Sequence, residues 1–277
     1  MRNAQHRWST WAARDKLCGP LALVLAGLVL VRLVGVIAAQ LVVPFDLVFE
    51  TPTLSVVQFL KTGGDPYSPE AYAQLPFVTT VYTPLYSLLA SLLPMPDANP
   101  FVSARLLSLC AMLGAAASLL GAGGGRRLIP WLAFACFFSF WPVVSNTAFA
   151  KSDPLALCLS AWAVVAVAHS RGSAARVVLA ALLCSLAIAT KQSYVAAPAA
   201  CLLYLAMSDT RGAWVFALSF SVVSLAMAGA ASWIWGQGFW FSVLVSPRNP
   251  VLASNAWAVS GDMLRQPLFG FLACVSL

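Results

Sequence analysis

The chain has 277 residues, of which 61% are hydrophobic and 9% charged, and its formal net charge is +7. Soluble domains carry about a quarter charged residues, so this composition excludes a chain that water surrounds on all sides and indicates a membrane protein. No basic stripe interleaved with aromatic residues points to nucleic acid. The basic excess instead fits cytoplasmic loops rich in Lys and Arg.

Long apolar runs predict α-helices, because the strands of a membrane barrel would alternate apolar and polar residues. A spanning helix needs about 20 apolar residues. The first run follows a basic stretch and is too long for the core of a secretory signal, so residues 1–18 are predicted as a cytoplasmic tail. The predicted spans lie near residues 19–42, 99–122, 128–149, 154–170, 176–190, 193–208 and 213–235.

An eighth apolar stretch begins near Pro267 and stops with the chain at Leu277. The predicted fold class is therefore all-α, a polytopic transmembrane helical bundle in a single domain of residues 1–277, truncated at the C-terminus. Segment 82–95 is also apolar, but as a helix of about 14 residues it would be only roughly 21 Å long. It is predicted as an interfacial helix or a half-buried hairpin arm.

Charge favours a topology in which segment 82–95 does not cross the membrane. The basic loops then lie on the side of the basic N-terminus, which the positive-inside rule places in the cytoplasm; they carry Arg126, Arg127, Arg171, Arg176 and Arg211. We therefore expect a multi-pass protein of the cytoplasmic (inner) membrane. Its extracytoplasmic regions are a long first outer loop (43–98), turns at 150–153 and around Lys191, and a later outer loop (236–266). The first loop is rich in aromatic and aliphatic residues and is expected to be partly helical.

Carboxylates gather on the predicted outer side. Asp46 and Glu50 follow the first span at a spacing of i, i+4, which would place them on one face of a helix. Such a pair suits a divalent cation such as Mg or Mn, or a general base for an acceptor hydroxyl; a solvated pair that helps to end the helix is the alternative. Asp153 precedes a proline at a predicted helix start, where it would cap the helix or belong to a site.

Lys151 and Lys191 are cations on the same predicted side. A lysine at membrane depth marks a functional site or extends its amine to the lipid headgroups. Cleavage of a sugar–phosphate bond on a polyprenyl carrier needs a cation or metal at the phosphate and a carboxylate near the acceptor, and these residues supply both. The seven cysteines form no CxxC pair, and the histidines, His6 and His169, are too far apart for a zinc site.

Four segments resemble, in order, motifs of C-type glycosyltransferases of the family 39 and family 87 kinds. They are GGDPYSPEAYAQLPFVTTVYTPLYSLL, VSARLLSLCAML, FAKSDPLALCLSAWAVV and LAIATKQSYVAAPAACLLYL, within residues 44–210. The resemblance implies a cell-envelope enzyme that transfers a hexose or pentose, with inversion, from a polyprenyl-phosphate donor to a lipid, glycan or protein acceptor. A departure is Thr83-Pro84-Leu85, where Pro-Pro-Leu is more usual.

The resemblance also implies roles for individual residues. Asp46 would be the catalytic base, Glu50 a second acid, and Asp153 a metal ligand or an acceptor-orienting group, with Asp46 and Asp153 as candidate ligands of the divalent cation. The donor-phosphate-binding residues would be Lys191, Lys151 and Arg105, and the substrate-binding residues Asp65, Tyr67 and Tyr82. A transporter or flippase of lipid-linked substrates is the rival reading, although no matching halves are visible, and an inactive truncated relative is a third.

Overall fold

The computed structural model describes residues 24, 27–47, 49–73, 78, 80–122, 129–247 and 261. All regular structure within these ranges is helical, in agreement with the predicted all-α class. Two of the described helices are long and apolar enough to cross a membrane, at Val102–Leu119 and Thr210–Val245. The shorter apolar helices are Gly27–Val42, Asp153–Ala168, Ala174–Thr190 and Ala196–Ser208. The predicted tail and the run from Pro267 lie outside the described residues.

The described chain separates into two compact units. The smaller unit contains α6 (Ile129–Ser139) and α7 (Trp141–Ser145). The sequence predicts one span over 128–149, and this is wrong because the helix breaks at Phe140. Pro142 has no amide hydrogen for a continuing helix, and the amides of Val143 and Val144 both return to the Phe140 carbonyl, at 3.0 and 3.1 Å.

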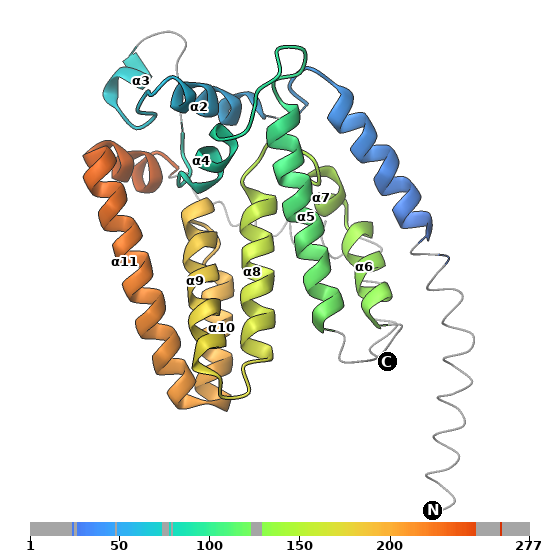
Figure 1. The fold of residues 1–277 in the computed structure, drawn as a ribbon, viewed down its shortest axis with the longest axis vertical. Helices are drawn as coiled ribbons and strands as arrows, with labels where there is room; N and C mark the ends of the chain where they lie inside the picture. Colours follow the sequence, from blue (N-terminus) through green and yellow to red (C-terminus); the bar gives the residue numbers. More distant parts are fainter. Residues whose placement is uncertain are drawn as a thin grey trace, which may run out of the picture. The chain divides into compact units, whose positions relative to one another are not determined.

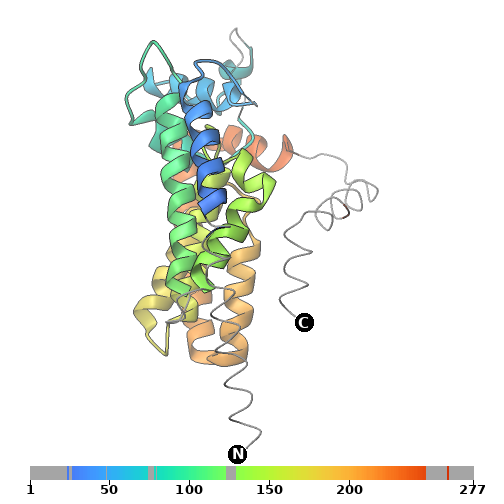
Figure 2. The same ribbon diagram turned by 90° about the vertical axis from the view of Figure 1, so that its right-hand side faces the viewer.

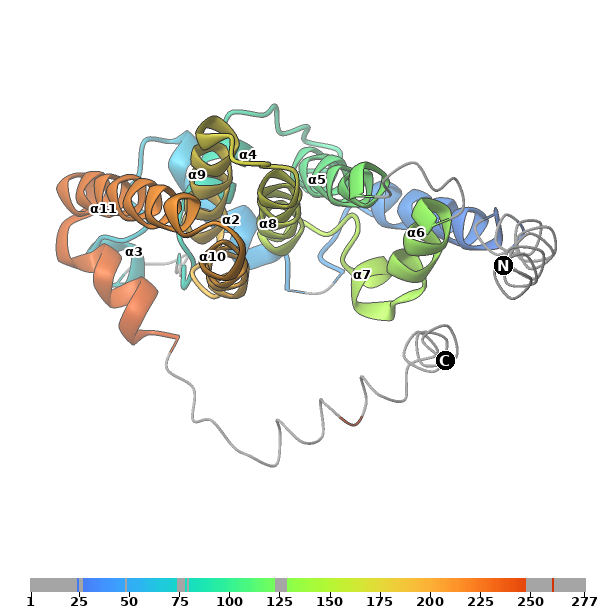
Figure 3. The same cartoon turned by 90° about the horizontal axis from the view of Figure 1, so that it is seen from below.

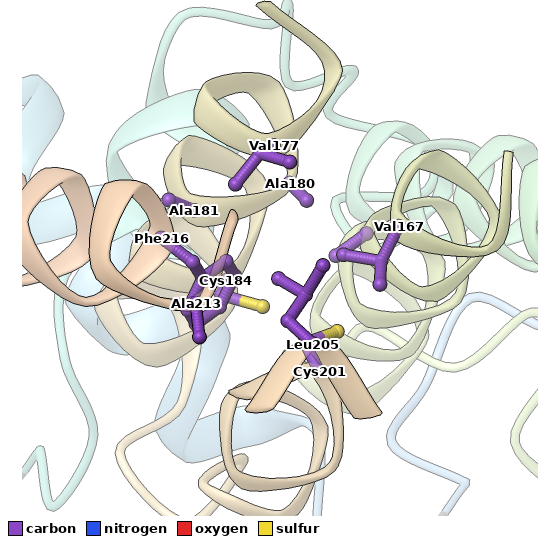
Figure 4. Close-up of a cluster of buried hydrophobic side chains, with 10 residues drawn as sticks. Val167, Val177, Ala180, Ala181, Cys184, Cys201, Leu205, Ala213 and Phe216 are labelled. Carbon is purple, nitrogen blue, oxygen red and sulfur yellow. The ribbon is translucent and has the colours of Figure 1, made fainter. Parts of the chain in front are cut away.

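The larger unit is built on four consecutive helices joined by short connections, α8 (Asp153–Ala168), α9 (Ala174–Thr190), α10 (Ala196–Ser208) and α11 (Thr210–Trp240). They lie side by side (Figures 1 and 3). Small side chains let their backbones approach closely. Their shared core lies towards the end where α8 and α10 finish (Figure 4); it includes Val167, Val177, Ala180, Ala181, Cys184, Cys201, Leu205, Ala213 and Phe216.

The first predicted loop folds into three short helices at the other end of α8 to α11 (Figures 1 and 2). They are α2 (Thr51–Lys61), α3 (Pro69–Ala73) and α4 (Leu85–Ser91), followed by the longer α5 (Val102–Ala122). α2 packs on α4 through Val57, Tyr86 and Ala90. With seven residues, α4 is only about 10 Å long, so it is too short to cross a membrane.

The end of α11 bends and meets the first loop. Gly236 has φ 57° and ψ −142°, a conformation that glycine adopts most readily, and the chain continues in helical turns to the π-helical η1 (Phe241–Val245). The predicted outer loop 236–266 is thus helical from its start to Val245. The Tyr67 ring contacts residues on both sides of this bend, with its centroid 5.2 Å from that of Trp235 and 5.3 Å from that of Phe239.

Gly238 allows this contact, and replacing it tests the contact. A Cβ at position 238 would lie 1.9 Å from the carbonyl oxygen of Tyr67. We expect Gly238→Ala to lower the free energy of unfolding by about 1–3 kcal/mol, because the end of α11 must move off Tyr67. Gly229→Ala is the matched control on the same helix, since nothing lies within 4 Å of its added Cβ. Thermal unfolding in detergent measures both, and equal stabilities of the two variants would contradict the contact.

Candidate functional site

The predicted outer regions come together at one end of the larger unit, where α8 begins and α9 ends. The Thr83 hydroxyl donates to the Ile188 carbonyl at 2.7 Å, joining the first loop to α9. The Gln192 side-chain nitrogen donates to the carbonyl of Val81 at 2.7 Å and to that of Val243 at 3.2 Å. Three segments far apart in the sequence thus meet beside Lys191.

An ion pair joins the start of α8 to the end of α9. The Lys191 ammonium donates to both carboxylate oxygens of Asp153, at 2.7 and 2.8 Å. The Asp153 side chain is 39% exposed and that of Lys191 17%. The predicted N-cap role of Asp153 is wrong by one residue, because Ser152 is the N-cap and Asp153 is the first residue of α8. Each charge still matches the dipole of its helix end.

The aromatic ring of Tyr82 also contacts the Lys191 ammonium. Its ring centroid lies 4.8 Å from the Lys191 ammonium, within the range of a cation–π contact. The backbone carbonyls of Val81 and Tyr82 accept from Gln192 and from the Tyr67 hydroxyl, the latter at 2.8 Å, and the side chain of Thr83 donates to α9. Tyr82, itself 41% exposed, is therefore fixed above Lys191 by its own backbone.

Two residues of the site are absent from the sequence-based predictions. The Tyr194 hydroxyl lies 3.2 Å from the Asp153 carbonyl oxygen and 3.4 Å from its Oδ1. Burial, and then the charge of Asp153, raises the pKa of Tyr194, so this hydroxyl stays protonated and donates. Gln192 anchors the neighbouring segments as described above. Both lie within three residues after Lys191, in KQSY. Their polar side chains in an apolar region were the feature of the sequence that could have indicated them.

Glu50 and Arg105 form a second pair, which is fully buried. Arg105 donates from Nε to Glu50 Oε1 at 2.9 Å and from Nη2 to Oε2 at 2.5 Å. Its other donors go to the carbonyls of Gln40 (2.7 Å), Val43 and Phe45 (2.8 Å). The five N–H groups of the guanidinium are thereby directed at protein acceptors, which leaves none for the predicted donor phosphate.

The Glu50 carboxylate is equally committed. Oε1 also accepts from the Ala150 amide at 2.7 Å, and Oε2 from the Leu47 amide at 3.1 Å. The buried pair therefore ties the first loop to α5 and to the segment that leads into α8. The geometry gives Glu50 a structural position, with no lone pair directed at an open space.

Asp46 accepts hydrogen bonds from the start of α2 and not from the groups that Glu50 binds. The predicted shared helix face is wrong, because residues 43–47, 49 and 50 are not helical and Phe49, at φ 53°, turns the chain before α2 begins. Asp46 instead accepts from the Glu50 amide at 2.9 Å and from the Thr51 amide and hydroxyl at 2.9 and 2.6 Å. Partial burial raises the pKa of Asp46, but these hydrogen bonds and Arg105 outweigh it, so the pKa is lowered overall.

The remaining predicted residues have structural partners. Asp65 Oδ1 accepts from the Tyr67 amide at 2.8 Å, as in an Asx turn, and Tyr67 is buried. The Lys151 ammonium lies 5.4 Å from the centroid of the Phe149 ring. Of the nine residues that the sequence singles out, the structure thus gathers Asp153, Lys191 and Tyr82 around one ammonium. Glu50 and Arg105 form a separate, buried pair.

The carboxylates do not fit a metal site made by the protein alone. No group of three or more His, Cys, Asp or Glu side chains gathers within the described residues. Asp153 already shares both oxygens with one ammonium, and Asp46 is held by the start of α2. Hard cations prefer several oxygen ligands, so no step of the reaction is derived through a metal below.

The apolar helices indicate a membrane protein. Its charged site lies where α8 begins and α9 ends, and it contains Asp153, Lys191, Tyr82 and Tyr194. The sequence profile of glycosyltransferase family 87 matches residues 79–275. The chain therefore belongs to glycosyltransferase family 87 and is a membrane glycosyltransferase. The match includes Asp153 and Lys191 and begins after Asp46. No curated protein and no solved structure matches the chain.

Proposed function

We propose that the chain transfers a sugar from a polyprenyl-phosphate donor to a lipid, glycan or protein acceptor. The proposed site is where α8 begins at Asp153 and α9 ends beside Lys191. The observation that supports this best is their partly exposed ion pair. It supplies a cation for the donor phosphate and a carboxylate for the acceptor hydroxyl. Family membership supports glycosyl transfer over the transporter alternative.

In the proposed reaction, the oxygen of the acceptor hydroxyl attacks the anomeric carbon of the donor sugar. The bond from this carbon to the phosphate oxygen breaks, and polyprenyl phosphate leaves with the electron pair. Asp153 accepts the hydroxyl proton, and Lys191 stabilises the negative charge that grows on the phosphate. A single displacement of this kind inverts the configuration at the anomeric carbon.

Glu50 and Arg105 receive a different role in this proposal from the one implied by the family resemblance. Their side chains touch each other and the backbone, so they act as positioning residues. Asp46 is the second candidate for the base. Its lowered pKa makes it a weaker proton acceptor, and Asp153 is therefore preferred.

We also propose that this helix end faces the extracytoplasmic side of the inner membrane, with the N-terminus in the cytoplasm. The support is the charge of the opposite end. Arg171, Arg176 and Arg211 lie at the turns where α8 meets α9 and α10 meets α11, and the positive-inside rule favours such loops in the cytoplasm.

The two candidate bases can be separated by transfer assays on membranes that carry the Asp153→Asn and Asp46→Asn variants. With a labelled polyprenyl-phosphate sugar, we expect Asp153→Asn to lose about 100-fold in transfer rate, because a general base contributes roughly 10²- to 10⁴-fold. Asp46→Asn should stay within a few-fold of wild type, since asparagine also caps a helix start. Loss in Asp46→Asn alone would assign the base to Asp46, and full activity of both would place the site elsewhere.

A further inference from the structure

The Asp153–Lys191 pair, as the structure shows it, blocks both of the roles proposed above. Two donors of the Lys191 ammonium are directed at Asp153, one to each carboxylate oxygen, and the Tyr82 ring lies against the same ammonium. An ammonium has only three donors. A phosphate needs the donors that Asp153 holds, and an acceptor hydroxyl needs a carboxylate that is no longer neutralised.

We propose that Asp153 occupies the place of the donor phosphate on Lys191, so that donor binding exchanges the ion pair and frees the carboxylate for the acceptor. This inference rests on the proposed function, because it takes Lys191 as the phosphate-binding residue. The exchange leaves the charge on the lysine's partner unchanged. A polyprenyl-phosphate sugar is a phosphodiester with one negative charge, and the Asp153 carboxylate also carries one negative charge. The partial exposure of both side chains leaves the pair within reach of the donor.

Tyr194 keeps Asp153 in place when the lysine turns away. Its hydroxyl is within hydrogen-bonding distance of both the Asp153 backbone carbonyl and Oδ1. The single hydroxyl proton can be donated to either oxygen, so Tyr194 can hold the residue at its main chain or at its side chain. Tyr194 is a positioning residue in this scheme: it orients the freed carboxylate without touching the donor.

Lys191 is prevented from moving far by Tyr82. The hydrogen bonds of Gln192 and Thr83 fasten the backbone on both sides of Tyr82 to the end of α9, so the ring and the lysine belong to one fixed segment. The ammonium can therefore turn from carboxylate to phosphate while remaining against the ring. The consequence is an order of events in which the donor binds before the acceptor is activated.

The test is the affinity of the purified full chain for polyprenyl monophosphate, measured by titration in detergent with EDTA present. Asp153→Asn should bind about three- to fivefold more tightly than wild type, because the competing partner of a partly exposed lysine is gone. Lys191→Met should bind at least tenfold more weakly. Asp97→Asn makes the same change of charge on the connection between α4 and α5 and should leave the affinity unchanged.

Weaker or unchanged binding by Asp153→Asn would overturn the exchange. If Mg²⁺ in place of EDTA strengthens binding by wild type and not by Asp153→Asn, a shared cation would replace it. If Lys191→Met binds as wild type does, the phosphate assignment itself fails, and the exchange fails with it. Tyr194→Phe gives the independent readout: the exchange predicts a lower kcat for transfer with unchanged phosphate affinity. A purely structural tyrosine would lower both together or neither, and that result would remove the positioning role.

Discussion

Glu50→Gln is expected to lower the free energy of unfolding by about 3–5 kcal/mol, because removing one partner of a buried ion pair leaves the other charge uncompensated. Both side chains are fully buried in this structure. The glutamine still fits the space, but it cannot neutralise Arg105. Thermal unfolding in detergent measures the loss, with the two-state free energy taken from wild type under the same conditions.

The buried pair offers an internal control. Arg105→Met alone should be as damaging as Glu50→Gln, whereas the double variant should lose much less than the sum, because both charges are then gone. Tyr86→Phe is a graded comparison. It removes only the hydroxyl that contacts the Ala104 carbonyl and Ser108, each at 2.8 Å, and should cost about 1 kcal/mol. Additive losses in the double variant would show that the two residues stabilise the protein independently.

The Glu50–Arg105 pair also contributes to the position of Asp153 in the candidate site. Glu50 accepts from the amide of Ala150, and three residues later the chain reaches Asp153. The buried pair therefore fixes the entry into α8, while the dipole of that helix favours the carboxylate at its start. Loss of Glu50 should therefore reduce transfer in two ways, through loss of folded protein and through a lower kcat of the molecules that remain folded.

Apolar run length and charge were sufficient to place most of the helices. The runs that predict spans 154–170, 176–190 and 193–208 coincide with α8, α9 and α10, because continuous hydrophobicity over such lengths fits only helices in lipid. The same pattern predicts Asp153 and Lys191 on the same side of the membrane. It missed the break at Phe140 and the turn at Phe49, because a single proline and one positive φ act locally within an otherwise apolar pattern.

Contacts between residues far apart in the sequence could not be predicted from the sequence. Arg105 and Glu50 are 55 positions apart, and nothing local distinguishes an arginine that binds a phosphate from one that binds a buried glutamate. The available signal was general: a charged residue inside an apolar helix needs a partner. Tyr194 likewise gave no pattern of its own, since its role depends on the approach of α8 to the end of α9.

Lys191→Met is expected to reduce kcat/KM for transfer by about 10³-fold, at the upper end of what one stabilising donor contributes. The reason is that the leaving phosphate gains negative charge as the sugar departs, so the lysine binds the transition state more strongly than the donor. Lys191→Arg keeps the positive charge but alters its geometry and should recover part of the rate. Transfer of labelled sugar by purified protein, corrected for the folded fraction, measures all three.

Lys151→Met is the matched comparison, because Lys151 is the other lysine that the sequence places at the donor phosphate. Lys151 is two residues from Asp153 along the chain, but its ammonium lies against the Phe149 ring, whereas that of Lys191 lies on the carboxylate itself. The proposed reaction requires the charge at Lys191, so Lys151→Met should change the transfer rate by no more than a few-fold. A large loss in Lys151→Met with an active Lys191→Met would move the phosphate to Lys151 and leave Asp153–Lys191 as a structural pair between α8 and α9.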